Sequence, residues 1–134
     1  MNAVVVMRAL LAAHAPLTAL VDVGRIVAGT VPQGLVPAIG IRELSRSETR
    51  PVSLSRASAL VAARVQVTVY AASYAQQKAL IQAARLGPGA HTGVIAGVRV
   101  LSVLRDAVGP DLGDGADGVC EQARDFQVTY VEPN

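Results

Sequence analysis

Hydrophobic and polar residues alternate most regularly in the middle of the chain, between Leu60 and Ala71. Small or β-branched apolar residues fill every second position, and residues such as Arg64 and Gln66 lie between them. A period of two is typical of a β-strand that buries one face and exposes the other. We therefore predict a strand in which these residues face the core: Val61, Ala63, Val65, Val67, Val69 and Ala71.

The period changes at Ser73, where the pattern predicts the start of a helix. Ser73 and Gln76 have the spacing of a capping box, in which the serine hydroxyl satisfies a free N–H group of the first turn. Gly87 and the proline after it are typical of a helix end. The predicted buried stripe consists of Ala75, Ala79, Ala83 and Leu86. Tyr74 and Ile81 fall on the other side, which predicts a second cover from a neighbouring subunit.

The remaining apolar patterns complete a small α+β domain. They predict helices over residues 3–14 and 17–21 and strands over residues 25–28, 38–47, 94–104 and 121–131. In the last strand, Phe126, Val128 and Tyr130 are expected to face inward. The order is helix, strand, strand, strand, helix, strand, strand, which favours a mainly antiparallel sheet with helices packed on one face. We expect residues 1–134 to form one domain.

The longest polar segment, residues 45–58, is predicted to be an exposed hairpin loop. It carries Arg46, Arg50 and Arg56 among serines. Guanidinium groups on such a loop suit either the carboxylates of a protein partner or the phosphates of DNA. From the residues alone, both partners stay open, as does a loop that contacts only water.

Composition narrows the function classes only slightly. A net charge of +2 does not by itself predict nucleic-acid binding, and an aromatic content of 3% argues against a protein that stacks bases. The N-terminal residues 1–15 lack a basic start, and Arg8 interrupts their apolar run, so we expect an amphipathic helix and no signal peptide. No apolar run reaches the length of a membrane span.

Candidate chemistry is sparse. His14 and His91 are the only histidines, Cys120 is the only cysteine, and none of them lies in a catalytic or metal-binding motif. The Asp/Gly segment 113–118 resembles part of a calcium loop, but Ca²⁺ needs six to eight oxygen ligands and a turn between strands explains the segment. We expect no catalytic residue, metal or cofactor. A small ligand-binding or enzyme domain stays an alternative, and it requires a pocket with convergent polar groups.

Three motifs, taken together, resemble one known family. Arg25-Ile26-Val27 leads into Val31-Pro32-Gln33, the centre reads RVQVTVYAASYAQQKAL from residue 64, and the chain closes with RDFQVTY from residue 124. Over nearly its whole length the chain resembles the tail completion or tail terminator proteins of long-tailed bacteriophages and of phage-like particles such as gene transfer agents. It departs from them at Val27 and Ala38, where the family usually has aromatic residues.

The resemblance implies a structural protein of the virion tail or neck, assembled in the bacterial cytoplasm, and no enzyme. It implies a hexameric ring that caps the tail tube, ends its polymerisation and joins the tail to the head-side connector. DNA would pass through the lumen without sequence-specific binding. The protein contacts would then involve Arg46, Arg50, Arg56, Tyr74 and Ile81.

Overall fold

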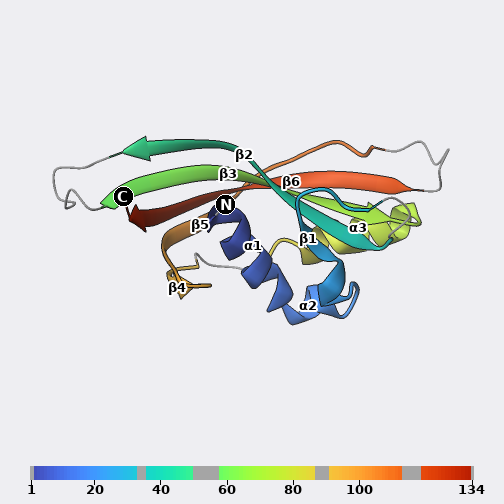
Figure 1. Ribbon diagram of the computed structural model, residues 1–134. Coiled ribbons are helices and arrows are strands. Elements are labelled where there is room, and N and C mark those ends of the chain that lie inside the picture. The colour runs from blue at the N-terminus through green and yellow to red at the C-terminus, as the bar shows by residue number, and fades with distance from the viewer. Residues whose placement is uncertain (1, 33–35, 50–57, 87–90, 113–118, 134) are drawn as a thin grey trace.

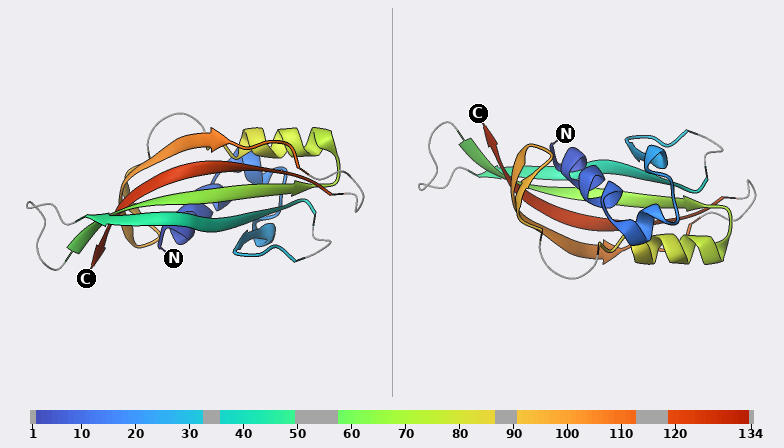
Figure 2. Two further views of the ribbon diagram at one scale, coloured as in Figure 1. Left: turned by 90° about the horizontal axis from the view of Figure 1, so that it is seen from above. Right: turned by 90° about the horizontal axis from the view of Figure 1, so that it is seen from below.

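The computed structural model describes residues 2–32, 36–49, 58–86, 91–112 and 119–133, which form an α+β fold (Figure 1). Its six strands form one sheet in the order β1-β2-β3-β6-β5-β4. Neighbouring strands are antiparallel except β1, which runs parallel to β2. The predicted class, a mainly antiparallel sheet with helices on one face, is confirmed, and the predicted order of elements is matched in outline (Figure 2).

The elements have the following bounds. The helices are α1 (Asn2–Ala12), α2 (Ala15–Thr18) and α3 (Tyr74–Ala83), with a short 3-10 helix, η1 (Val23–Arg25). The strands are β1 (Ile26–Ala28), β2 (Ala38–Thr49), β3 (Ser58–Ala71), β4 (Gly93–Ile95), β5 (Val98–Val108) and β6 (Cys120–Pro133).

Strand β3 lies at the centre of the sheet, as its alternation predicts. All six inward-facing residues predicted between Val61 and Ala71 are fully buried. On the neighbouring strand β6, Phe126, Val128 and Tyr130 are buried as well, and Phe126 pairs with Val65 across the two strands. Because both strands have a period of two, their apolar side chains form one continuous layer on one face of the sheet.

The helices cover this apolar layer. Helix α1 buries Val6, Met7 and Leu11, and these residues belong to the same core cluster as the inward side chains of β3. Figure 2 shows α1, α2 and α3 on the same side of the sheet. The opposite side, here called the open face, carries the outward-pointing residues of β3 and β6, among them Arg64 and Asp125.

The face that helix α3 turns to the sheet differs in part from the predicted stripe, of which Leu86 is buried and Ala83 packs against the core as expected. Gln77, Leu80 and Ile81 are its buried residues, whereas Ala75 and Ala79 are exposed. The larger side chains bury more apolar area than alanines do, so they take the face toward the core. Ile81 is only 8% exposed within its own chain, and its predicted contact with a neighbouring subunit stays a prediction.

The predicted strand over residues 94–104 is a hairpin. Strands β4 and β5 are joined by Ala96 and Gly97, whose φ angles of 52° and 79° are those of a type I′ turn. A bulge in β5 between Val100 and Ser102 then reverses the alternation that was expected beyond it. As a result Leu104, an even number of positions after the buried Val100, is 52% exposed.

Strand β2 extends into the segment that was predicted to be a loop. Residues 45–49 pair with β3, from Ser45 opposite Arg64 to Thr49 opposite Leu60. Their side chains are polar, but pairing with β3 satisfies the backbone N–H and C=O groups that point toward β3. The rest of the predicted loop, residues 50–57, and the Asp/Gly segment 113–118 lie outside the described residues.

Candidate interaction surfaces

Arg46, which had been assigned to the loop, lies on β2 between two carboxylates. Its Nη2 atom is 2.7 Å from Oε1 of Glu48 on the same strand, and it also pairs with Glu132 at the end of β6. The hydrogen bond to Glu132 is the main reason why the pKa of Arg46 is raised. Glu132 also accepts a hydrogen bond of 3.5 Å from Nδ2 of Asn2, so these contacts join β2, β6 and the start of α1.

These contacts change what can be expected of the three arginines. The charge of Arg46 is already matched by carboxylates of its own chain, which reduces its value for binding phosphate groups. Arg50 and Arg56 lie outside the described residues, so their part in any contact stays a prediction. The structure therefore places one of the three predicted contact residues, and places it in an ion pair.

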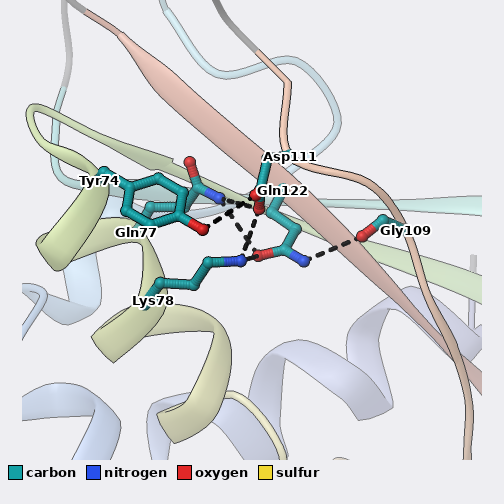
Figure 3. Close-up of polar contacts among 6 residues, drawn as sticks. All are labelled: Tyr74, Gln77, Lys78, Gly109, Asp111 and Gln122. Atoms are coloured by element: carbon teal, nitrogen blue, oxygen red, sulfur yellow. Dashed lines mark hydrogen bonds and ion pairs between the residues drawn. The ribbon is translucent and has the colours of Figure 1, made fainter.

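Tyr74 takes part in a polar cluster between α3 and the segment after β5 (Figure 3). Its hydroxyl donates to Oδ2 of Asp111 over 3.1 Å, and Nζ of Lys78 lies 2.6 Å from Oδ1 of the same carboxylate. The Lys78 ammonium group is also 5.0 Å from the centroid of the Tyr74 ring, within the range of a cation–π contact. One acidic side chain thus holds two residues of the first turns of α3.

Two amides form the buried part of this cluster. Nε2 of Gln77 donates to Asp111 over 2.8 Å and to Oε1 of Gln122 over 3.2 Å, and Nε2 of Gln122 donates to the carbonyl of Gly109 over 2.9 Å. Both amides are more than nine-tenths buried, so these bonds supply the partners that buried polar groups require. We call Tyr74, Gln77, Lys78, Asp111 and Gln122 the α3 polar cluster.

The electrostatics of the α3 polar cluster favour a fixed ion pair. The hydrogen bond from Lys78 is the main cause of the lowered pKa of Asp111, and the same bond raises the pKa of Lys78. Both groups therefore stay charged at neutral pH, where neither is suited to transfer a proton. The cluster instead orients the Tyr74 side chain, which is 56% exposed.

The open face of the sheet is polar and internally paired. Nε and Nη2 of Arg64 bind Oδ2 of Asp125 at 3.0 and 2.7 Å, and Nε of Arg42 donates to Oε1 of Gln66 over 3.0 Å. A groove of about 440 Å³ lies at one end of this face. Its lining includes Arg42, Gln66, Tyr70, Leu112 and Glu121.

Both outer edges of the sheet are only partly covered. Strand β1 pairs with β2 at residues 39–41, and β4 pairs with β5 at residues 98–100. Within the described part of the chain, no further strand lies beside residues 44–49 of β2 or 101–108 of β5. We call these two segments the β2 edge and the β5 edge. Unpaired strand edges of this length readily accept another strand.

Exposed apolar side chains follow these edges. Leu44, on the β2 edge, is 42% exposed, and three more large apolar residues, Leu101, Leu104 and Val108, are exposed on the β5 edge. Strands β2, β3, β6 and β5 alternate in direction, so β2 and β5 run in opposite directions. When two copies lie side by side in the same orientation, the β5 edge of one copy is therefore antiparallel to the β2 edge of the other.

Sequence reasoning missed the α3 polar cluster and both edges. Gln77 lies three and four positions before Leu80 and Ile81, so its place on the apolar face was a usable signal for a buried, bonded amide. Its partner Asp111 lies 34 residues further along the chain, and no local pattern links the two. The edges depend on which strands pair and over what length, and this is a property of the tertiary structure.

The isolated candidate residues stay apart. His14 precedes α2, and Cys120 is a free, half-buried thiol at the start of β6. Across the described ranges, no three His, Cys, Asp or Glu side chains come together as metal ligands. None of the described helices is long and apolar enough to cross a membrane.

The described residues form a small α+β fold with one helical layer and two partly open sheet edges. No protein-family model and no curated protein matches its sequence. Among solved structures, a similar chain occurs in the virion of a native gene transfer agent particle, with a TM-score of 0.62 at 18% sequence identity. The match covers 98% of this chain and 95% of that chain. At this identity the similarity establishes a shared fold.

Proposed function

We propose that this protein is a structural subunit of a phage-like particle, in which it forms a hexameric ring at the head-side end of the tail tube. The ring ends polymerisation of the tube and joins the tail to the connector of the head. The observation that carries the proposal is the similarity in fold, over nearly the full length of both chains, to a chain of a gene transfer agent virion. The three sequence motifs support it independently.

The two sheet edges supply a way for copies to join. A ring needs head-to-tail contacts, in which one surface of a subunit meets a different surface of the next. The β2 edge and the β5 edge are such a pair, because they lie on opposite sides of the sheet and run in opposite directions. Antiparallel pairing between them continues the sheet from one copy to the next.

In this role the chain acts without catalysis or a cofactor. Its partners are further copies of itself, the tail tube protein and the connector protein, and DNA passes through the lumen without sequence readout. Residues 50–57, which join β2 to β3 in the sequence, are the segment proposed to reach a tube or neck protein. The protein is proposed to assemble in the bacterial cytoplasm and to remain in the tail or neck of the particle.

The first test is native mass spectrometry of the purified protein, with negative-stain images of the same sample. A mass of six subunits and a ring with a central hole are the expected result. If the protein is a monomer, it is then mixed with its tail tube protein, on which the ring is expected to form and to limit tube length. Failure to form a ring in both conditions, with tube length unchanged, contradicts the proposal.

A further inference from the structure

Basic side chains gather on the helix-covered side of the sheet, where the end of α3 approaches β5. Arg85, which follows α3, His91 and Arg105 of β5 line a pocket of about 400 Å³. Apolar residues complete its wall: Leu86, Val103, Leu104 and Phe126. None of these residues belongs to the α3 polar cluster or to the groove of the open face.

A buried arginine lies next to this pocket. Arg124, two positions from Phe126 on the same face of β6, is only 7% exposed. Its Nη1 atom donates to the carbonyl of Ile81 over 2.9 Å, but its buried Nε atom has no hydrogen-bond partner within the described part of the chain. Nε2 of His91 is also buried without a partner there. Two polar nitrogens at this site thus have unused hydrogen-bonding capacity.

Within the part of the chain that the structure describes, no acidic side chain pairs with these arginines. The ion pairs among the described residues involve Arg46, Arg64 and Lys78, and none of them involves Arg85, Arg105 or Arg124. The side chain of Arg85 lies instead beside a neutral amide, and when the Gln82 amide is oriented with its oxygen toward Arg85, that oxygen accepts from Nη1 and Nη2 over 3.2 and 3.1 Å.

The charges also oppose one another. Burial is the main cause of the lowered pKa of Arg124, and the positive charges of Arg105 and Arg85 lower it further. A buried cation among like charges is unfavourable unless an anion compensates it. Guanidinium groups bind carboxylates and phosphates through paired, charge-assisted hydrogen bonds.

We propose that the pocket lined by Arg85, His91 and Arg105 binds an oxyanion, as a phosphate or a carboxylate group. The two arginines contact the anion directly, and Arg124 stabilises it from behind through its charge. The buried residues of the apolar wall, Leu86, Val103 and Phe126, lower the local dielectric on one side of the site, which strengthens these interactions. The pocket is lined by side chains of one chain, so binding of a free oxyanion does not depend on a ring, whereas binding of an acidic side chain from a second copy rests on the proposed ring.

Two sources can supply this group: a free oxyanion in solution, or an acidic side chain of a second copy. The test for a free oxyanion measures thermal unfolding of the full chain in sodium phosphate and in sodium chloride of equal ionic strength. Phosphate at ten times its Kd is expected to raise the Tm of the wild type by about 4 °C relative to chloride. Sodium acetate is the matching probe for a carboxylate.

The variant Arg105→Gln is expected to weaken anion binding at least tenfold, because it removes a lining charge. Arg99→Gln is the matched control, since Arg99 is an exposed arginine of the same strand that does not line the pocket. Arg124 is left unchanged because its burial makes a folding defect the expected effect of replacing it. Equal Tm values in chloride for both variants and the wild type verify that folding is intact.

The outcomes distinguish the two sources. Tight phosphate binding with normal assembly of Arg105→Gln identifies a free oxyanion. Weak binding of both phosphate and acetate, with a ring that fails to form only in Arg105→Gln, identifies an acidic side chain of a second copy. The proposal is overturned if wild type and Arg105→Gln respond equally to phosphate, or if phosphate has no specific effect while Arg105→Gln assembles normally.

Discussion

At the residue scale, Gly40 shows how one missing side chain shapes the fold. Gly40 lies on β2, and a Cβ atom there would be 3.0 Å from Cγ2 of Val31 and 3.2 Å from the carbonyl oxygen of Gly29. The segment after β1 therefore packs directly over the backbone of β2. This close contact holds the edge of the sheet where β1 ends.

We predict that Gly40→Ala lowers the free energy of unfolding by about 1–3 kcal/mol, because the new methyl group must displace packed atoms. Urea unfolding followed by circular dichroism measures this change. Gly24→Ala is the control, since no atom lies within 4 Å of a Cβ built there. This variant is expected to raise the free energy of unfolding by about 0.4–1 kcal/mol, because alanine reduces the conformational entropy of the unfolded chain. Equal effects at the two positions would contradict the packing argument.

The ion pair of the α3 polar cluster leads to a prediction about pH. The folded-state pKa of Asp111 is lowered, mainly by the hydrogen bond from Lys78. The contribution of the Asp111 carboxylate to folding stability is therefore complete above its unfolded pKa of about 3.9, and it is lost as pH falls through the folded pKa. The pKa of Lys78 is raised, so its contribution is lost only as pH rises through that folded pKa, above about 10.4.

We therefore predict that the Tm of Asp111→Asn falls less steeply than that of the wild type between about pH 4 and pH 2. The variant has no Asp111 carboxylate whose protonation would weaken the α3 polar cluster. Thermal melts at a series of pH values measure the slope. The Tm of Lys78→Gln should also fall less steeply over this pH range, because the variant lacks the main cause of the lowered pKa of Asp111. Parallel curves for wild type and Asp111→Asn would contradict the prediction.

At the scale of elements, the turn between β4 and β5 uses a residue that is poorly suited to it. Ala96 has a φ angle of 52°, a left-handed conformation that is unfavourable for residues with a Cβ atom. We predict that Ala96→Gly raises the Tm by a few degrees, which corresponds to an increase of about 0.5–1 kcal/mol in the free energy of unfolding. Gly97→Ala, at a φ of 79°, should have the opposite effect. A loss of stability in Ala96→Gly would contradict this account of the turn.

The elements with a strong local pattern were predictable from sequence. The period of two in β3 and β6 placed Val65 and Phe126 in the core. The predicted cap of α3 is present, since Oγ of Ser73 accepts from the N–H of Gln76 over 3.2 Å, while Oε1 of Gln76 accepts from the N–H of Ala72 over 2.8 Å. The elements that failed depend on information outside the local window. The face that α3 buries follows from the distant partner Asp111, and the β5 pattern is displaced by a bulge.

The candidate surfaces were less predictable than the fold. Arg46 was assigned to a contact loop from its polar surroundings, but its partner Glu132 lies 86 residues away and could not be inferred from spacing. Tyr74 was correctly placed near the start of α3, and its exposure leaves its predicted role in contacts untested. Sequence patterns identify which residue types are present at a surface, whereas the sheet topology decides which of them meet.

At the scale of the whole molecule, the two sheet edges predict how assembly can be blocked. We predict that Leu44→Lys and Leu104→Lys each abolish ring formation in native mass spectrometry, because a charge on either edge opposes pairing with a neighbouring strand. Both residues are exposed, so the stability of the single chain should change by less than about 0.5 kcal/mol. Leu20→Lys is the matched control, since Leu20 is 44% exposed but lies away from both edges.

The segment between β2 and β3 separates the proposed structural role from nucleic-acid binding. We predict that replacing Arg50 and Arg56 together with serine impairs particle assembly while the affinity of the free protein for DNA stays weak and unchanged. Adding Arg46→Ser tests all three arginines, with some loss of stability expected from the broken pair with Glu132. A steeply salt-dependent DNA affinity that disappears in the double variant would favour a nucleic-acid-binding module.

The hydrogen bond between Asn2 and Glu132 has a practical consequence for these experiments. It brings the two ends of the described chain to the same end of the sheet, where Glu132 also holds Arg46 of the β2 edge. An affinity tag at either terminus would therefore lie beside a surface proposed to join subunits.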